Sequence, residues 1–286
     1  MKLGIFYAVL SAFFSALMGV FVKLIGNAVP LSVLVFSGFA TSLILVVPWL
    51  IRDRTFRLKV PHPWLYLTRS IAGLASVACF LYVAKLMPLV DAILLNSTAP
   101  LFVPVVAVVL TKARTPRSVW GGVALGFLGV VLVLHPGPQL FQLDSMIGLS
   151  AGLLFAIAIV QGRTLLKTSS PTQLLFYYWV VGAAICGIAA FLQWRFPSGR
   201  DTWALLGGLG LCSTLTQVFA ALSYARAPVR LTSSLIFLGL VFAGLFDWLV
   251  WKEVPGLLTL IGIAVVILGA VITILAGEQD LAKTAK

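Results

Sequence analysis

The stretch that decides the fold runs from Pro88 to Leu134 and reads PLVDAILLNSTAPLFVPVVAVVLTKARTPRSVWGGVALGFLGVVLVL. It is an apolar segment with internal prolines, then a short basic turn, then an apolar segment with spaced glycines. The same layout returns in the second half of the chain, from Pro228 to Ile274. The shared punctuation is a proline at the start (Pro88/Pro228), a lysine at the turn (Lys112/Lys252) and two glycines seven apart (Gly122/Gly262, Gly129/Gly269). We interpret this pattern as an internal duplication.

The composition is that of a membrane protein. Hydrophobic residues make up 61% of the chain and charged residues 10%, and the mean hydropathy is +1.10. A soluble domain could not bury this much apolar sequence. Apolar stretches of about 20 residues, the length that crosses a bilayer, follow one another almost end to end. The net charge of +12 does not indicate nucleic acid, because the basic residues lie in the short gaps between apolar stretches.

We predict ten membrane-spanning helices. Their approximate ranges are 3–24, 31–50, 64–86, 89–111, 117–134, 146–166, 172–193, 203–224, 228–250 and 256–276. With the N-terminus inside, 15 lysines and arginines fall on the inner side and 5 on the outer side. Since positively charged loops stay in the cytoplasm, both termini are expected to be cytoplasmic. The first span is expected to be a membrane helix and not a cleaved signal peptide, because it is too long and nine others follow.

Ten spans in two copies of five have a geometrical consequence. Because five is odd, the second copy (residues 141–286) must insert upside down relative to the first (residues 1–140). Inverted repeats are typical of secondary transporters, whose substrate site lies near the middle of the membrane between the copies. We therefore predict one all-α membrane domain, residues 1–286, built as two inverted five-helix repeats.

Two motifs carry a resemblance to a known family. The segment Pro88–Phe102, which contains NSTAPLF, resembles the fourth helix of the drug/metabolite transporter superfamily, EamA-like branch. Trp251–Glu253 (WKE), followed by Gly262 and Gly269, is similar to its ninth-to-tenth helix junction. The resemblance implies a basket of two inverted repeats that moves metabolites, mostly outward, through a central cavity, with helices five and ten at the periphery. The chain departs from the family pattern at Lys112–Arg114 (KAR), where the first copy lacks the acidic residue that the second has.

The sharpest candidate for a substrate site lies in the fourth span. Pro100 and Pro104 fall near mid-membrane, and since proline has no N–H, the carbonyls of Asn96 and Pro100 lose their helical partners. Such carbonyls must be satisfied by protein or by a water-lined cavity. We therefore predict substrate binding by Asn96, Ser97, Thr98 and Pro100. The alternative is a packing kink in which the Ser and Thr side chains bond to their own helix.

In the aligned helix of the second copy, glycine takes the place of this proline pattern. Gly239 and Gly244 lie in the ninth span, and we expect that helix to bend there. The two copies would then hinge at different residues.

Further candidates carry polar or aromatic side chains in other spans. Ser213, Thr216 and Gln217 share one face of the eighth span, and a glutamine in a membrane helix avoids lipid. The remaining substrate-binding candidates are Ser11, Ser15, Thr41, Tyr82, Trp179 and Phe237. For the polar residues the alternative is hydrogen bonding that holds helices together, and for the aromatic residues it is ordinary packing or an interface position.

Acidic residues within the apolar stretches are few. Asp91 opens the fourth span and Asp247 closes the ninth, and Lys85 and Lys252 are near enough in sequence to pair with them. Proton coupling through Asp91 or Asp247 is a hypothesis, because intramembrane acids often serve as relays; a position at the interface is the alternative. With no ionisable residue expected at mid-depth, the cargo is expected to be neutral, zwitterionic or amphipathic, such as an amino acid.

These features predict a secondary transporter, an exporter of small metabolites in a bacterial cytoplasmic membrane. No cofactor, metal or nucleic-acid partner is expected, since the sequence has neither a P-loop nor a metal-binding spacing. The string Gly148–Gly152 (GLSAG) matches a hydrolase motif but lies in a predicted membrane helix. The alternatives are a lipid-processing membrane enzyme and a lipid flippase. A monomer or a homodimer is expected, with the GxxxG of Gly122–Gly126 as the candidate dimer face.

Overall fold

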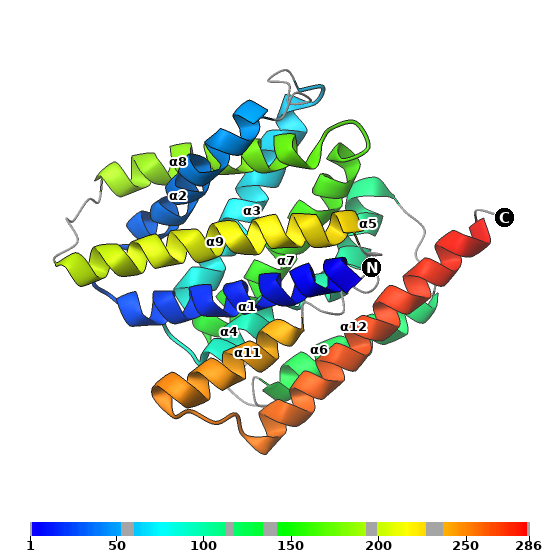
Figure 1. Cartoon of the computed structure of the whole chain (residues 1–286). Coiled ribbons are helices and arrows are strands. Elements are labelled where there is room, and N and C mark those ends of the chain that lie inside the picture. The colour runs from blue at the N-terminus through cyan, green and yellow to red at the C-terminus, as the bar shows by residue number, and fades with distance from the viewer. Residues whose placement is uncertain are drawn as a thin grey trace.

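The chain is helical throughout the residues that are described. The computed structural model describes residues 2–52, 60–112, 117–133, 142–192, 199–226 and 237–284, and no strand occurs in these ranges. Figure 1 shows the arrangement. The helices are α1 (Lys2–Ile25), α2 (Leu31–Arg52), α3 (Pro63–Val83), α4 (Leu89–Asn96), α5 (Ala99–Thr111), α6 (Arg117–Val133), α7 (Leu143–Leu165), α8 (Pro171–Leu192), α9 (Arg200–Arg226), α11 (Leu238–Phe246), the π-helix η2 (Asp247–Trp251) and α12 (Leu257–Thr284).

The helices have the length and surface of membrane helices. Six are long and apolar enough to span a bilayer, namely α1, α3, α4 with α5, α7, α8 and α9, and shorter apolar helices occupy 31–47, 119–133, 238–251 and 257–273. Large hydrophobic side chains such as Phe191, Leu257 and Ile44 are exposed on the outside of the bundle. A soluble protein would not tolerate so much exposed apolar surface, whereas lipid requires it. Each of the ten predicted ranges overlaps one of these helices; that all ten cross the membrane stays a prediction.

The helices of the second half repeat the positions of those in the first. Helix α8 begins and ends later than α2 by the same interval that separates Pro88 from Pro228, and the starts of α6 and α12 are separated by that interval too. The aligned lysines at the basic turn share a conformation, because Lys112 (φ 53°) and Lys252 (φ 61°) are the only non-glycine residues with positive φ in the described ranges. Both end a helix in the left-handed conformation that normally favours glycine.

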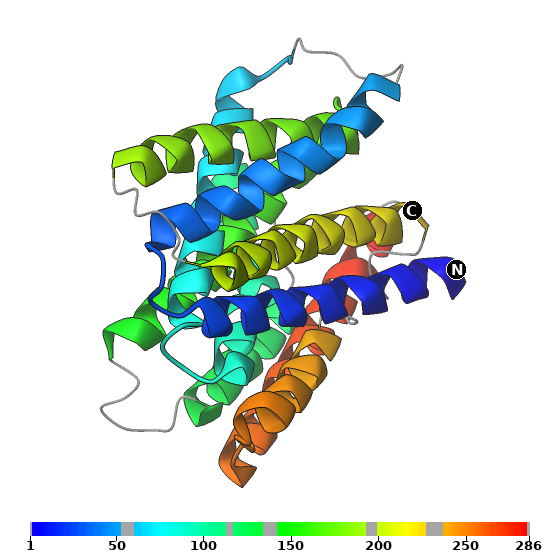
Figure 2. The same cartoon turned by 60° about the vertical axis from the view of Figure 1, so that its left-hand side comes forward.

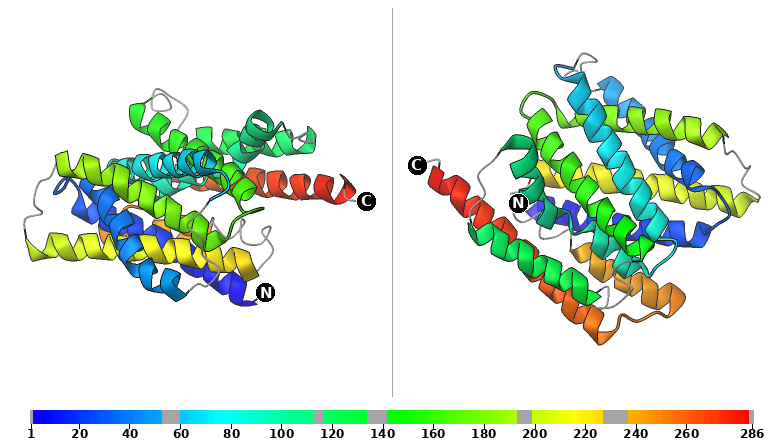
Figure 3. Two further views of the ribbon diagram at one scale, coloured as in Figure 1. Left: turned by 90° about the horizontal axis from the view of Figure 1, so that it is seen from above. Right: turned by 180° about the vertical axis from the view of Figure 1, so that it is seen from behind.

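The packing of helices across the two halves is reciprocal. If α1, α2, α3 and α4 are matched with α7, α8, α9 and α11, then the contact of α1 with α9 corresponds to that of α7 with α3. The contact of α1 with α11 corresponds in the same way to that of α7 with α4. Figures 1 and 2 show α1 beside α9, and the right-hand view of Figure 3 shows α3 beside α7. Such exchange is what a twofold relation between the halves would produce.

The α6–α12 pair lies at the edge of the molecule (Figure 3), where glycines let the two helices touch. A Cβ on Gly129 would stand 2.6 Å from the amide nitrogen of Val266, and one on Gly262 would stand 2.9 Å from the carbonyl oxygen of Gly129. Gly122 also faces α12, and Gly126 lies between Leu101 of α5 and Gly269 of α12. The expectation that the GxxxG forms a dimer face is therefore wrong, since α12 of the same chain already covers it.

Candidate functional site

The fourth predicted span is interrupted at Ser97 and Thr98, between α4 and α5. Ser97 ends α4 with φ −74° and ψ 0°, and α5 begins at Ala99 and continues through Pro104. Because Pro100 has no N–H, the carbonyl of Asn96 cannot bond to the residue four positions later. The interruption thus lies where the prolines predicted it.

Two residues of this motif have a packing role. Ser97 and Thr98 are buried, and the Thr98 hydroxyl donates a 2.6 Å hydrogen bond to the carbonyl of Leu95 in its own helix. Gly152 of α7 lies so close that a Cβ there would overlap the Thr98 hydroxyl. For Thr98 the contacts fit the packing alternative. Asn96 is half-buried and retains side-chain surface beside the break.

The hydrolase-like string Gly148–Gly152 serves the same contact. Gly148 faces Leu95, one turn before the site where Gly152 faces Thr98. Ser150 is exposed and donates to the carbonyl of Met146 within α7. The motif is a packing face of a continuous helix, which lacks the strand and turn that a nucleophilic serine needs.

A hydrogen bond between helices accounts for the Ser11 side chain, whereas the Thr216 hydroxyl donates to the carbonyl of Cys212 within α9. The Ser11 hydroxyl on α1 donates to the carbonyl of Thr216 on α9 at 2.9 Å. A second link, which sequence reasoning missed, joins the buried hydroxyls of Ser42 on α2 and Thr214 on α9, also at 2.9 Å. Ser42 and Thr214 are adjacent in sequence to the predicted candidates Thr41 and Ser213. The prediction therefore identified the right part of each helix but missed the bonding residue by one position.

Two more candidates pack against glycines of neighbouring helices. Thr41 lies against Gly210 of α9, and Ser213 of α9 lies against Gly38 of α2. These contacts bring α2 and α9 together and match the packing alternative. The remaining polar candidates, Ser15 and Gln217, are half-buried.

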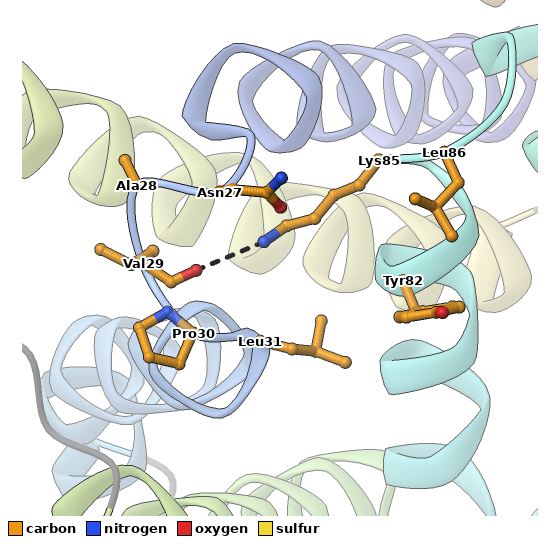
Figure 4. Close-up of a pocket in the computed structure, with 8 residues that line it drawn as sticks. All are labelled: Asn27, Ala28, Val29, Pro30, Leu31, Tyr82, Lys85 and Leu86. Carbon is orange, nitrogen blue, oxygen red and sulfur yellow. Dashed lines mark hydrogen bonds between the residues drawn. The ribbon is translucent and has the colours of Figure 1, made fainter.

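A cavity of about 280 Å³ lies at the α1–α2 turn (Figure 4). It is lined by Asn27, Ala28, Val29, Pro30, Leu31, Tyr82, Lys85 and Leu86. Of the predicted site residues it includes Tyr82 alone. The Lys85 ammonium reaches the carbonyl of Val29 at 3.4 Å, as the dashed line in Figure 4 shows. The cavity is at the end of α3 and apart from the α4–α5 break.

The other two aromatic candidates are core residues. Trp179 of α8 and Phe237, which precedes α11, are both buried in the main hydrophobic cluster. Their surroundings therefore fit the alternative interpretation, which is ordinary packing.

The two acidic candidates differ in their surroundings. Asp91 lies in the first turn of α4, where the helix dipole favours a carboxylate. Asp247 is 1% exposed and joins three elements. Its Oδ1 accepts from the Lys23 ammonium of α1 at 3.1 Å, and its Oδ2 accepts from the backbone N–H of Val90 at the start of α4 at 3.0 Å. Lys23 also contacts Glu253 at 3.1 Å.

The predicted pairing of Asp247 with Lys85 or Lys252 is wrong. Its cation is Lys23, distant in sequence, whereas Lys85 bonds to a backbone carbonyl and Lys252 is an exposed helix cap. Lys23 also lies 4.3 Å from the ring centroid of Trp251. Sequence proximity could not identify this pair, because the contact depends on how α1 packs against the end of η2.

The ninth span has its irregularity in a different place from the one expected. Gly239 and Gly244 lie inside the continuous helix α11, beside Ile93 and Val90 of α4. The expected bend at these glycines is therefore wrong: they allow α11 to approach α4. The helix widens later, in the π-helix Asp247–Trp251, where the N–H of Lys252 bonds to the carbonyl of Asp247. Single π-turns often occur at functional sites.

One charged residue was missed within the bundle. Arg69 counts among the basic residues of the inner side and falls within the predicted span 64–86; it lies in α3, where its Nε and Nη1 atoms are buried without a hydrogen-bond partner. Its position in the apolar run after Pro63 was the available signal.

An apolar, all-helical surface, helices paired across two halves and a proline-broken helix define an integral membrane protein built like a transporter. The chain belongs to the EamA-like transporter family, whose model matches residues 2–135 and again residues 144–275. It is a member of a family of transporters, so the alternative of a lipid-processing enzyme is set aside.

Several proteins named as transporters are similar over nearly the whole chain. The pseudopaline exporter CntI of Pseudomonas aeruginosa is 25% identical over 272 residues, 95% of each chain. The S-adenosylmethionine uptake transporter of Rickettsia felis is 25% identical over 276 residues, 96% of this chain and 93% of that one. The riboflavin transporter of Vibrio cholerae is 24% identical over 84% of this chain and 81% of its own. One crystal structure shares the fold, with a TM-score of 0.68, 18% identity and coverage of 97% of this chain and 98% of that one.

Proposed function

We propose that this chain is a secondary transporter that moves a small metabolite across a bacterial cytoplasmic membrane by alternating access. Two inverted five-helix halves, residues 1–140 and 141–286, would rock against each other. The observation that carries the proposal is the reciprocal packing of α1 with α9 and of α7 with α3. The two separate matches of the family model support the same division.

Export is the proposed direction, since the similar proteins include one named as an exporter. Relatives named as uptake transporters make direction a matter for experiment. Purified protein in sealed vesicles should exchange labelled solute across the bilayer without changing it chemically. S-adenosylmethionine, riboflavin and amino acids are the first solutes to test. Exchange in protein-free vesicles is the control, and a protein-dependent flip of labelled lipid alone would favour the flippase alternative instead.

The orientation is proposed from the charge bias. The ends of α1 and α12 that carry the two termini lie on the same side in Figures 1 and 3, which an even number of spans requires. A cysteine at position 56 should resist an impermeant thiol reagent in intact cells, and one at position 140 should react. Both positions lie outside the described residues. The reverse labelling would show that the topology is inverted.

Asn96 is proposed to contact the cargo beside the break in the fourth span. Asn96→Ala should raise the apparent KM by roughly twofold to tenfold, the worth of one or two neutral hydrogen bonds. The amount of folded protein should not change, because the side chain is half-buried and ends α4. Counterflow at several solute concentrations measures the effect. An unchanged KM would place the site elsewhere.

Pro100 is proposed to provide the hinge of the same span. Pro100→Ala restores an N–H that can bond to the carbonyl of Asn96 and so join α4 to α5; Pro100 would lie in the interior of that joined helix, where proline costs about 3 kcal/mol. The variant should fold but transport slowly. Pro63→Ala is the control, because Pro63 occupies the first turn of α3, where a missing N–H has no partner to lose. Equal transport by both variants would show that the kink is packing only.

A further inference from the structure

Buried polar atoms without a partner gather in one part of the molecule. Among the described residues, these atoms belong to Arg69 and Ser70 of α3 and Gln161 of α7, and to the hydroxyls of Tyr66 of α3 and Ser169 in the turn after α7, which are near enough to interact with each other. The three residues of α3 are three and four positions apart and share one face of that helix. Helix α3 packs against α7 and α8. Since buried polar groups in native proteins nearly always have partners, this cluster indicates that a hydrogen-bonding molecule belongs there.

Arg69 supplies the charge of this cluster. Its guanidinium carbon lies 4.8 Å from the ring centroid of Tyr178 on α8. A Cβ built on Gly162 of α7 would stand 3.7 Å from its Nε, so the guanidinium lies among three helices. The ion pairs of Lys23 with Asp247 and Glu253 do not involve Arg69. Arg69 is half-buried, but its Nε and Nη1 atoms are removed from water. Such guanidinium nitrogens are normally matched by a carboxylate or phosphate, and a ring face compensates the charge only in part.

The fold itself does not require an arginine at this position. When the halves are aligned as Pro88 with Pro228, Arg69 corresponds to Leu209 and Tyr178 corresponds to Gly38. Leu209 is 1% exposed, and its Cδ2 is 3.5 Å from where a Cβ of Gly38 would be. The same junction of three helices is therefore filled by apolar packing in the other half. The charge and the unpaired polar atoms are specific to the α3–α7–α8 junction.

We propose that Arg69 binds a carboxylate of the transported molecule at the junction of α3, α7 and α8. The inference rests on the proposed function, because it assigns a chemical group to the cargo of a transporter. Arg69 is six residues after the start of α3, about 9 Å along the helix. It lies near the helix ends that the charge bias places toward the cytoplasm. A carboxylate that enters from that side replaces water around the guanidinium with two or more charge-assisted hydrogen bonds.

The hydroxyls and amide around Arg69 suit a zwitterionic cargo. Tyr66 and Ser70 can donate to the same carboxylate, and Gln161 Oε1 can accept from an amino group. The phosphate of a lipid headgroup offers the same anionic oxygens, so the experiment must separate the two sources.

The test uses the full chain, purified in detergent, and three variants. Arg69→Leu installs the residue found at the corresponding position, and Arg69→Lys keeps the charge with a different donor geometry. Arg163→Gln is the matched control, since Arg163 is an exposed arginine next to Gly162 on the same side of the molecule. Thermal unfolding is followed with acetate against acetamide, and with S-adenosylmethionine against its decarboxylated form, at constant ionic strength.

In the parent and in Arg163→Gln, the carboxylate member of each pair should raise the unfolding temperature and the amide or decarboxylated member should not. Arg69→Leu should fold and lose this preference, with affinity weaker by about tenfold to a hundredfold, the worth of a hydrogen bond to a charged group. If Arg69→Leu fails to fold, Arg69→Lys decides. Affinity about tenfold weaker supports the proposal, and unchanged affinity overturns it.

Two further outcomes separate the proposals. If vesicles carry a solute but Arg69→Leu keeps the parent's preference for carboxylates, the inference is overturned and the transport function stands. If no solute crosses in the parent, the transport function fails and the inference fails with it. Stabilisation by phosphatidylglycerol micelles, lost in Arg69→Leu while acetate has no effect on the parent, would assign Arg69 to lipid and overturn the cargo assignment.

Discussion

Asp247→Ala is expected to lower the free energy of unfolding by about 3–5 kcal/mol, because it leaves a charge without its buried partner. The Asp247 side chain is 2% exposed and that of Lys23 is 14% exposed, and their charged atoms are 3.1 Å apart. The substitution also leaves the backbone N–H of Val90 without an acceptor. Thermal or denaturant unfolding in detergent measures the loss.

Glu253→Gln is the matched control for this prediction. Glu253 contacts the same ammonium at 3.1 Å, but its side chain is 50% exposed. Exposed ion pairs contribute about 0–1 kcal/mol, so this variant should unfold nearly like the parent. If both variants lowered the free energy of unfolding equally, the burial of Asp247 would not explain its contribution to stability.

A double variant tests whether the charge or the packing matters. Lys23→Met combined with Asp247→Ala removes both charges, so no ion stays buried alone. Its loss of stability should be well below the sum of the two single losses. An additive result would show that Lys23 and Asp247 do not interact.

The proton-coupling hypothesis for Asp247 has a separate readout. Asp247→Asn keeps the shape of the side chain but cannot release a proton. If coupling passes through Asp247, this variant keeps exchange between equal solute pools and loses transport driven by a pH gradient. Gradient-driven transport equal to that of the parent would leave Asp91 as the remaining candidate.

Much of the fold follows from the sequence because it depends on local punctuation. Hydrophobic length fixes where helices occur, and Lys112 and Lys252 both end helices where the repeat placed them. The paired glycines 122/262 and 129/269 recur because each lies where α6 and α12 touch. Such a pattern can be recognised in the sequence because the close contact of the two helices requires glycine at these positions.

The site is less predictable because it depends on which helices meet. Arg69 reads as one more basic residue of the inner side until α7 and α8 are seen to pack around it. Lys23 and Asp247 are separated by 224 residues, so their pairing is invisible before packing is known. Thr98 shows the opposite case: its position in the motif was correctly noted, yet its hydroxyl bonds to its own helix.

Gly122→Ala is expected to destabilise the protein by about 1–3 kcal/mol, the usual cost of overpacking a tight contact. The added Cβ would stand 2.6 Å from the Thr273 hydroxyl, 2.7 Å from the Thr273 amide nitrogen and 2.9 Å from the Gly269 carbonyl oxygen. Two of these atoms belong to the backbone of α12, so no side-chain rotation relieves the overlap. The two helices must separate, which loosens the contact of Gly129 with Val266 as well.

Gly121→Ala makes the same chemical change one residue earlier on α6 and isolates this contact. No atom lies within 4 Å of a Cβ at Gly121, and alanine is the better helix former by about 1 kcal/mol. Gly121→Ala should therefore be as stable as the parent or slightly more stable, and unfolding of both variants in detergent gives the difference. Light scattering adds a second readout: since Gly122 faces α12 of its own chain, Gly122→Ala should lose stability without changing the oligomeric state. Dissociation of a dimer in Gly122→Ala, with monomer stability unchanged, would instead return the GxxxG to an intermolecular role.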